Sequence, residues 1–367
     1  ISQYNDFKPD HYGPSQLERK LKSITETLSK IGDGTGPDVV LLQEIELDRT
    51  PKEHLSATEL LKEALVDKGL GPYHLAKGRI EDLPLEKSPA IVCVTLSKFP
   101  IKETRNHWTE RARPVLETHL DVDGRTLVVF NNHWKSGASS AKTEPIRIQN
   151  ATVLRKRIDE LIKQDPAIDI IVGGDLNSHY NQKQVFEGVM PKTAVNDVLL
   201  SQGNESLMSS STPMLYNLWH ELQPKDRGSD VWKGEWGTLM HLVLSHGLYD
   251  DQGIQYQADS FRVATLEDLN VLPGSGIPNR WYNDFGGLGI SDHLPVIATF
   301  ATARKGKPVE IGTNHPETPS VLPKVDYAKA ITQAKPFDAN ATVPGNFRKI
   351  FSFAGEVVLN KPLTVET

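Results

Sequence analysis

The stretch IVGGDLNSHY, residues 171–180, begins as an aliphatic strand and ends on polar side chains. Its two glycines come directly before Asp175, and Asn177 follows two residues later. A buried strand must have its polar neighbours satisfied or used. A carboxylate and an amide at its end therefore form either a capped turn or part of a reactive site. Whether other strands end in the same way decides between these interpretations.

The surrounding sequence alternates between strand-like and helix-like patterns. After Pro14-Ser15, apolar residues recur every three or four positions, which predicts an amphipathic helix. Strands interspersed with helices predict an α/β or α+β fold in which a mixed sheet packs against helices. Further helices are predicted at 56–69 and 145–164, and strands at 39–46, 90–97, 114–123, 123–134, 167–177, 239–245 and 293–300.

Length and composition suggest one large domain with an appendage. The chain has 367 residues, of which 38% are hydrophobic. We expect a catalytic domain over residues 1–300. From 301 to 367 the composition becomes proline-rich, which predicts a C-terminal extension of unknown role. Residues 179–238 lack clear periodicity and predict loops over one edge of the sheet.

Charge and apolar content restrict the function. The 41 Lys and Arg residues against 47 Asp and Glu residues give a net charge of −6, which argues against a general basic surface for nucleic acid. Any polyanion must therefore bind locally. No apolar run reaches the roughly 18 to 20 residues of a transmembrane helix. The single cysteine, Cys93, excludes an internal disulfide.

Four of the predicted strands carry polar residues at an end. Each residue alone has an ordinary structural explanation, such as a cap, a packed histidine or an Asx turn. Together they amount to three carboxylates, two amides and two histidines. They are Glu44, Asn132, His133, Asp175, Asn177, Asp292 and His293.

This inventory favours one kind of chemistry. Hard divalent cations such as Mg²⁺ prefer carboxylate oxygen, with phosphate as a natural co-ligand. Amides and imidazoles can hold phosphate oxygens, and a carboxylate can activate water. The chain has no cysteine cluster and no HExxH helix, so it is poorly suited to zinc.

The motifs LLQEIE, NNHWKSG, GGDLNSH and SDHLPV, in this order, resemble those of the endonuclease/exonuclease/phosphatase (DNase I-like) superfamily. The resemblance covers about residues 14 to 300. It implies a four-layer α/β sandwich of two packed mixed sheets flanked by helices, with the site at one end of the sheets. It also implies hydrolysis of phosphoric esters with Mg²⁺, or alternatively Mn²⁺ or Ca²⁺.

The resemblance assigns a role to each motif residue. It makes Glu44 the metal-binding glutamate and Asp292 a second carboxylate of the metal site. Asp175 matches the aspartate that orients or deprotonates the attacking water. Asn177 matches the amide that holds a phosphate oxygen.

The two histidines and three further residues are assigned to the substrate. His133 resembles the histidine near the leaving group, and His293 the histidine that contacts the phosphate at the centre of the reaction. Asn132, Arg113 and Lys135 are predicted to bind substrate, with the match of Arg113 the loosest.

The chain departs from the family pattern at two places. The first strand of the family normally supplies an asparagine beside the metal, and we expect that strand to be missing from this chain. Relatives also commonly carry an aspartate that bonds the histidine of the SDH motif. Met240 stands at that position, and either Asp230 or Glu235, nearby in sequence, could replace the acid.

These features predict a phosphodiester hydrolase, with a nuclease as the leading interpretation. A phosphatase or a lipid-headgroup phosphodiesterase of the same superfamily is the alternative, and a non-catalytic protein that binds phosphate ligands is a third. The substrate is expected to be nucleic acid and the protein a monomer. The start at Ile1 and the proline-rich tail favour an exported bacterial protein.

Overall fold

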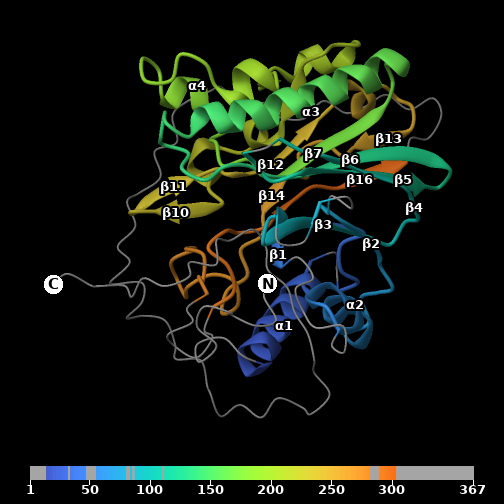
Figure 1. Ribbon diagram of the computed structural model, residues 1–367, viewed down its shortest axis with the longest axis vertical. Helices are drawn as coiled ribbons and strands as arrows, with labels where there is room; N and C mark the ends of the chain where they lie inside the picture. Colours follow the sequence, from blue (N-terminus) through green and yellow to red (C-terminus); the bar gives the residue numbers. More distant parts are fainter. Residues whose placement is uncertain are drawn as a thin grey trace.

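The computed structural model describes residues 14–31, 34–46, 55–79, 83–84, 87–109, 111–281 and 289–302. Its regular elements form four layers (Figure 1). One long helix covers a seven-stranded sheet, which packs on a three-stranded sheet, which in turn is covered by two helices. This is the predicted α/β sandwich of two packed sheets flanked by helices.

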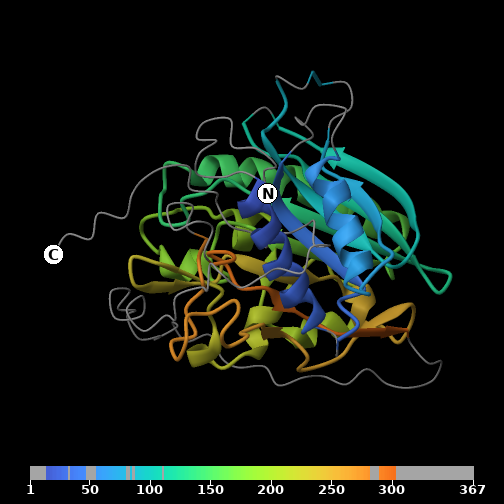
Figure 2. The same ribbon diagram turned by 90° about the horizontal axis from the view of Figure 1, so that it is seen from below.

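The three-stranded sheet has the order β1-β3-β2 and is antiparallel throughout. Its strands are β1 (Val39–Glu46), β2 (His74–Lys77) and β3 (Ile91–Ser97). Helices α1 (Pro14–Ser29) and α2 (Ala57–Asp67) lie over its outer face, as the view from below shows (Figure 2). A capping box between Ser56 and Glu59 starts α2 and satisfies its first backbone donors.

The seven-stranded sheet has the order β4-β5-β6-β7-β12-β9-β8. Strands β6 and β7 are parallel, and α3 (Glu144–Gln164) connects them across the outer face of the sheet. Its strands are β4 (Ile101–His107), β5 (Val115–Val122), β6 (Arg125–His133), β7 (Asp169–Asp175), β8 (Ser201–Gln202), β9 (Leu215–Asn217) and β12 (Met240–Leu244).

Smaller elements lie around the two sheets. The hairpin of β10 (Asp230–Trp232) and β11 (Glu235–Gly237) stands beside the end of β12. Two further pairs join β13 (Ile254–Tyr256) to β16 (Phe300–Thr302) and β14 (Arg262–Val263) to β15 (Val296–Ile297). Short helices are α4 (Gln182–Val185), η2 (Ala194–Val198), η3 (Glu205–Ser209), η4 (Leu218–Glu221), η5 (Pro224–Asp226) and η6 (His246–Tyr249).

Three apolar clusters hold the layers together. One packs α1 and α2 on the three-stranded sheet, a second packs α3 on the seven-stranded sheet, and a third fills the space between the sheets. Burial of these apolar side chains is the main favourable contribution to folding. Among the helices of the described ranges, none combines the length and apolar character needed to span a bilayer.

The structure differs from the sequence-based expectation in two segments. The predicted strand 293–300 is divided between β15 and the start of β16, because its ends pair with different partners. Residues 179–238 contribute β8 and β9 to the edge of the large sheet as well as loops and the β10–β11 hairpin. The predicted C-terminal extension lies outside the described residues from 303 onward.

Candidate active site

Three neighbouring strands place one row of side chains at the end of the large sheet. His133 at the end of β6 is the register partner of Asp175 on β7, and Asp175 is in turn the partner of Met240 on β12. Register partners share a face of a sheet. This row faces the three-stranded sheet, because Asn131, two residues before His133, accepts a hydrogen bond from Gln43 of β1 at 2.7 Å.

The opposite sheet adds Glu44 to this row. Oε1 of Glu44 lies 3.5 Å from Nε2 of His133, which in turn lies 3.6 Å from Oδ2 of Asp175. Glu44 is 1% exposed and stands at a break in the β1–β3 register with a φ of 58°. A non-glycine residue in this left-handed region is strained, and such strain is commonly found at functional sites.

The two glycines before Asp175 permit close packing of the backbone. A Cβ on Gly173 would lie 2.6 Å from Leu41 of the opposite sheet. A Cβ on Gly174, whose φ is +110°, would lie 2.2 Å from the carbonyl oxygen of Asn132 on β6. The glycines therefore bring the strands and the sheets together at the site.

Asp175 and Asn177 form a tight turn in which both side chains are used. The backbone N–H of Asn177 donates to Oδ1 of Asp175 at 2.7 Å, and its side-chain amide donates to Oδ2 at 2.6 Å. Burial raises the pKa of Asp175 to about 6, opposed by the charge of His293 and the backbone hydrogen bond. A carboxylate with a pKa near neutrality is suited to accept a proton from water.

The two histidines of the site differ in charge state. Burial, with the positive charges of Arg113, His293 and Lys135, holds the pKa of His133 well below its usual value. Burial also lowers the pKa of His293, but the surrounding carboxylates outweigh it and raise this pKa overall. His133 is therefore a neutral imidazole near pH 7, whereas His293 is biased toward the imidazolium.

The carboxylates that act on His293 are those of the whole predicted site. They belong to Asp292, Asp230, Asp175 and Glu44. The structure thus brings the strand ends of both sheets and the SDH motif to one place. Asp292 also forms an ion pair with Arg280, whose Nη2 lies 3.3 Å from Oδ2.

The predicted substrate residues are placed differently from one another. Arg113 lies beside the site and donates from Nη1 to the carbonyl oxygen of Trp134 at 3.1 Å. The amide of Asn177 donates to the same oxygen at 3.2 Å. Lys135 is exposed at the start of the following loop.

Asn132 does not reach the site. Its side chain lies on the other face of the sheet from its neighbour His133, since successive side chains of a strand alternate. It donates to the carbonyl oxygens of Phe130 and Gly173 and accepts from the indole N–H of Trp134, and it is fully buried. Its amide is occupied by contacts within the sheet, so the prediction that Asn132 binds substrate does not fit this position.

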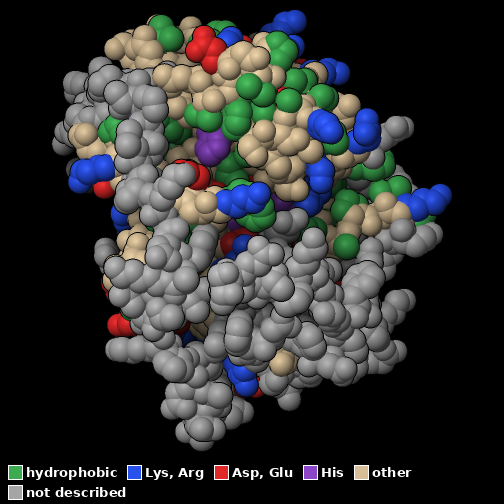
Figure 3. Space-filling view, turned by 90° about the vertical axis from the view of Figure 1, so that its left-hand side faces the viewer, with side chains coloured by type: hydrophobic (Ala, Val, Ile, Leu, Met, Phe, Trp, Pro, Cys, Tyr) green, Lys and Arg blue, Asp and Glu red, His purple; other side chains and the backbone are tan. Residues whose placement is uncertain are grey.

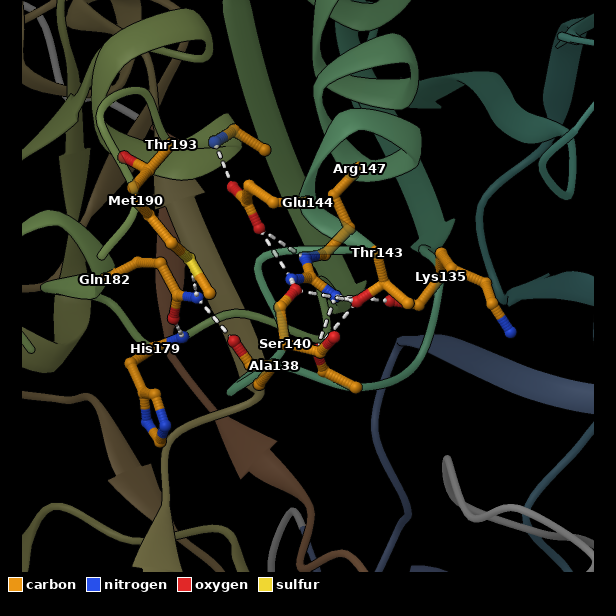
Figure 4. Close-up of polar contacts among 12 residues, drawn as sticks. Lys135, Ala138, Ser140, Thr143, Glu144, Arg147, His179, Gln182, Met190 and Thr193 are labelled. Carbon is orange, nitrogen blue, oxygen red and sulfur yellow. Dashed lines mark hydrogen bonds and ion pairs between the residues drawn. The ribbon is translucent and has the colours of Figure 1, made fainter. Parts of the chain in front are cut away.

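A buried arginine fixes the loop that follows His133. Arg147 of α3 is fully buried, pairs with Glu144 and donates to the carbonyl oxygens of Lys135, Gly137 and Ser140 (Figure 4). Gln182 donates to Ala138 at 2.7 Å and thereby ties this loop to the segment after Asn177. The Lys135 side chain points away from these contacts (Figure 4).

Sequence reasoning missed two basic residues at the site. Lys20 of α1 is 5% exposed and donates to the carbonyl oxygen of Ile290 at 2.7 Å. Burial lowers its pKa to about 8, against the charges of Asp292 and Glu44. A lysine on the same helical face as Leu17 and Ile24 was the available signal. Arg280 carried no signal, because it lies in a segment without periodicity.

The donor set fits a hard divalent cation. Mg²⁺ is commonly held by one or two carboxylates, with waters and substrate phosphate completing its shell. Glu44 and Asp292 can supply these carboxylates, and both act electrostatically on His293. Within the described ranges, no three His, Cys, Asp or Glu side chains are already arranged around a common metal position. On the face where the β10–β11 hairpin lies, acidic, basic and histidine side chains lie close together in a recess (Figure 3).

A family model described as the endonuclease/exonuclease/phosphatase family matches residues 3–302. The chain belongs to this family. The match extends over nearly all of the part that carries the four motifs, and it confirms the resemblance. Members of the family hydrolyse phosphoester bonds, and divalent metal dependence is general in the superfamily. No curated protein sequence matches the chain.

Several solved structures resemble the chain at low sequence identity. Truncated TDP2 of Caenorhabditis elegans is 15% identical, with 78% of this chain and 91% of that chain covered and a TM-score of 0.46. TDP2 of D. rerio, solved with a single-strand DNA product, is 15% identical, with 82% and 97% covered and a TM-score of 0.47. Sphingomyelinase C of Streptomyces griseocarneus is 17% identical, with 79% and 92% covered and a TM-score of 0.46.

Proposed function

We propose that this protein is a metal-dependent phosphodiesterase that hydrolyses its substrate by direct attack of water on phosphorus, and that the substrate is nucleic acid. The main support is the position of Asp175. It is buried, its pKa is raised to about 6, and it lies in one row with His133 opposite the metal-type carboxylate Glu44.

The proposed reaction gives separate roles to Asp175, Asn177 and His293. Asp175 accepts a proton as the water oxygen attacks phosphorus, and Asn177 orients the Asp175 carboxylate through two hydrogen bonds. The bond from phosphorus to the leaving oxygen then breaks, and the leaving oxygen takes its proton from solvent. His293, biased toward its charged form, contacts the phosphoryl oxygens. A divalent cation held by Glu44 and Asp292 would supply charge stabilisation for the phosphate.

Nucleic acid is favoured by side chains around the site rather than by the overall charge. Arg113 and Lys135 act electrostatically on His133, so their positive charges lie near the phosphate position. Trp232 is 63% exposed and lies on the same face of β10 as Asp230, because side chains of a strand alternate. An exposed indole beside a phosphodiester site can stack a base.

One activity survey tests the proposal. The purified chain is incubated with bis(p-nitrophenyl) phosphate, plasmid DNA, RNA, p-nitrophenyl phosphate and sphingomyelin vesicles, each with Mg²⁺ and with EDTA. The expected result is hydrolysis of the diester and of nucleic acid, abolished by EDTA. Mn²⁺ and Ca²⁺ are compared with Mg²⁺ on the diester.

Other results identify the alternatives. Preference for the monoester would indicate a phosphatase, and turnover of the vesicles without nucleic acid a lipid-headgroup phosphodiesterase. Binding of phosphate ligands without turnover of any ester would indicate a non-catalytic protein. Each of these three outcomes would contradict the nuclease proposal.

A further inference from the structure

The backbone of Asp230 is paired directly with that of His293. The two residues form an antiparallel bridge at the start of β10, and the N–H of Leu294 donates to the carbonyl oxygen of Ser229 at 2.6 Å. Residues opposite one another in such a bridge carry their side chains on the same face, with Cβ atoms about 4.5–5.5 Å apart. The side chains of Asp230 and His293 therefore lie on the same face, without a hydrogen bond or ion pair between them.

The Asp230 carboxylate is held in place from several sides. Its Oδ1 accepts hydrogen bonds from the hydroxyl of Ser229 at 3.0 Å and from the backbone N–H of Leu239 at 3.2 Å. A Cβ on Gly237, its register partner, would lie 2.3 Å from Oδ2 of Asp230, so the absence of a side chain there makes room for the carboxylate. Asp230 is 6% exposed, and no described residue donates to its Oδ2.

The imidazole of His293 likewise has a nitrogen without a partner among the described residues. Its Nδ1 is buried and has no hydrogen-bond partner among the described residues. A histidine that contacts a substrate through one nitrogen usually needs an acceptor at the other nitrogen to fix its tautomer and ring orientation. At the position where relatives carry an aspartate, Met240 offers only a thioether, which is a weak acceptor.

The other nearby carboxylates are engaged elsewhere. Asp175 accepts two hydrogen bonds from Asn177, and Asp292 pairs with Arg280. Glu44 lies beside His133 on the opposite sheet. Glu235, the other acid near in sequence, is exposed on β11. Asp230 alone combines burial, proximity to His293 and an oxygen that no described donor uses.

We propose that Asp230 is the positioning residue of His293: when substrate binds, Nδ1–H of His293 turns toward Oδ2 of Asp230, and the hydrogen bond so formed holds Nε2 toward the phosphate. The acid that relatives place on the strand of Met240 has thus moved to the adjoining hairpin. This inference rests on the proposed phosphodiesterase function. It also gives the β10–β11 hairpin a role, because the same face of β10 carries the exposed Trp232.

The test is a set of variants measured with bis(p-nitrophenyl) phosphate and saturating Mg²⁺. Asp230→Asn keeps an oxygen for Ser229 and Leu239 but replaces the charged acceptor Oδ2 by an NH₂ group. We expect kcat to fall about ten- to a hundredfold, with KM changed less than about threefold. Glu235→Gln, the matched control on the same hairpin, should retain wild-type kcat.

Two double variants separate positioning from a structural role. Adding Met240→Asp to Asp230→Asn restores the acid at the position used by relatives, and kcat should recover about tenfold or more. In a His293→Ala background, Asp230→Asn should change kcat less than about twofold, because the residue on which Asp230 acts is gone. A merely structural role would lower kcat in both backgrounds and would not be rescued.

The outcomes are distinguishable. Wild-type protein without diesterase activity would overturn the proposed function and this inference together. An active wild type with Asp230→Asn above half of its kcat, or with equal losses in both backgrounds, would overturn the inference alone. Thermal melting tests whether each variant is folded. If Asp230→Asn does not fold, Asp230→Glu, which displaces the carboxylate, replaces it with the same expected direction.

Discussion

Nε2 of His133 lies 3.5 Å from Oε1 of Glu44, although the two residues belong to different sheets. Neither sheet alone contains a complete site, because Asp175 and His133 come from one sheet and Glu44 from the other. The interior between the sheets is apolar, whereas the charged groups gather at its end. The site is therefore complete only when the two sheets are packed against each other.

Replacement of the proposed general base should separate activity from folding. Asp175→Asn is expected to lower kcat about a hundred- to ten-thousand-fold, because it removes the proton acceptor. It also places an NH₂ group against a donor of Asn177, which should cost about 1 kcal/mol of unfolding free energy. Kinetics and thermal melting measure the two effects.

The control for this variant is Asp123→Asn. Asp123 lies exposed in the β5–β6 turn with a φ of 52°, which asparagine also tolerates. Its activity and melting temperature should equal those of the wild type. An Asp175→Asn enzyme that keeps more than about a tenth of wild-type kcat would refute the assigned role.

Removal of the Glu44 carboxylate should weaken the binding of Mg²⁺. Glu44→Gln takes one negative charge from the site, so the Mg²⁺ concentration for half-maximal activity should rise at least about tenfold. An Mg²⁺ titration of diester hydrolysis measures this, with the exposed Glu187→Gln as control. An unchanged titration would mean that Glu44 is not a ligand.

Acid should destabilise the fold through Glu117, which pairs with Arg157 of α3. Glu117 is fully buried and accepts hydrogen bonds from His107 at 2.5 Å, His119 at 2.6 Å and Arg157 at 2.8 Å. Burial alone would raise the pKa of Glu117, but these partners lower it well below 4.5.

The direction of the pH effect follows from this lowered pKa. The ionised carboxylate stabilises the fold fully above about pH 4.5, and this contribution is lost as pH falls toward the folded-state pKa. Denaturant unfolding between pH 6 and pH 3 should show a steeper loss for the wild type than for Glu117→Gln. Glu117→Gln should itself be less stable at pH 6 by about 3 kcal/mol, because Arg157 loses its buried partner. Parallel pH profiles would exclude this role for Glu117.

The exposed indole on the hairpin should distinguish polymer from small substrates. Trp232→Ala is expected to raise KM for single-stranded DNA about five- to thirtyfold, which corresponds to about 1–2 kcal/mol of stacking. KM for bis(p-nitrophenyl) phosphate should stay within about twofold. Val189→Ala, at another exposed apolar residue, is the control. Equal effects of Trp232→Ala on both substrates would rule out a stacking role.

The sequence allowed most of the fold and much of the site to be predicted. Continuous apolar runs located β1 and β7, and helical periodicity located α1 and α3. The structure places the strand-end residues of the four motifs near one another, with the exception of Asn132. Their chemical roles and the domain boundaries stay predictions.

Other features depend on tertiary contacts that no local pattern reveals. Asn132 lies beside His133 in sequence but on the other face of its strand, where partners occupy its amide. The pairing of Asp230 with His293 joins residues 63 positions apart and arises from a hairpin of three-residue strands. Short strands carry too few residues for alternation to be recognised.

The hydrogen bond from Lys20 to the carbonyl oxygen of Ile290 joins residues 270 positions apart. During synthesis the helix that carries Lys20 emerges early, but its partner and the SDH motif are made only near residue 290. At about 5–20 residues per second, the ribosome needs roughly 15–60 s to cover this interval. The nascent chain therefore cannot assemble the proposed centre before the SDH motif has been made, and a polypeptide that terminates before Ile290 would lack hydrolytic activity however well its first strands fold.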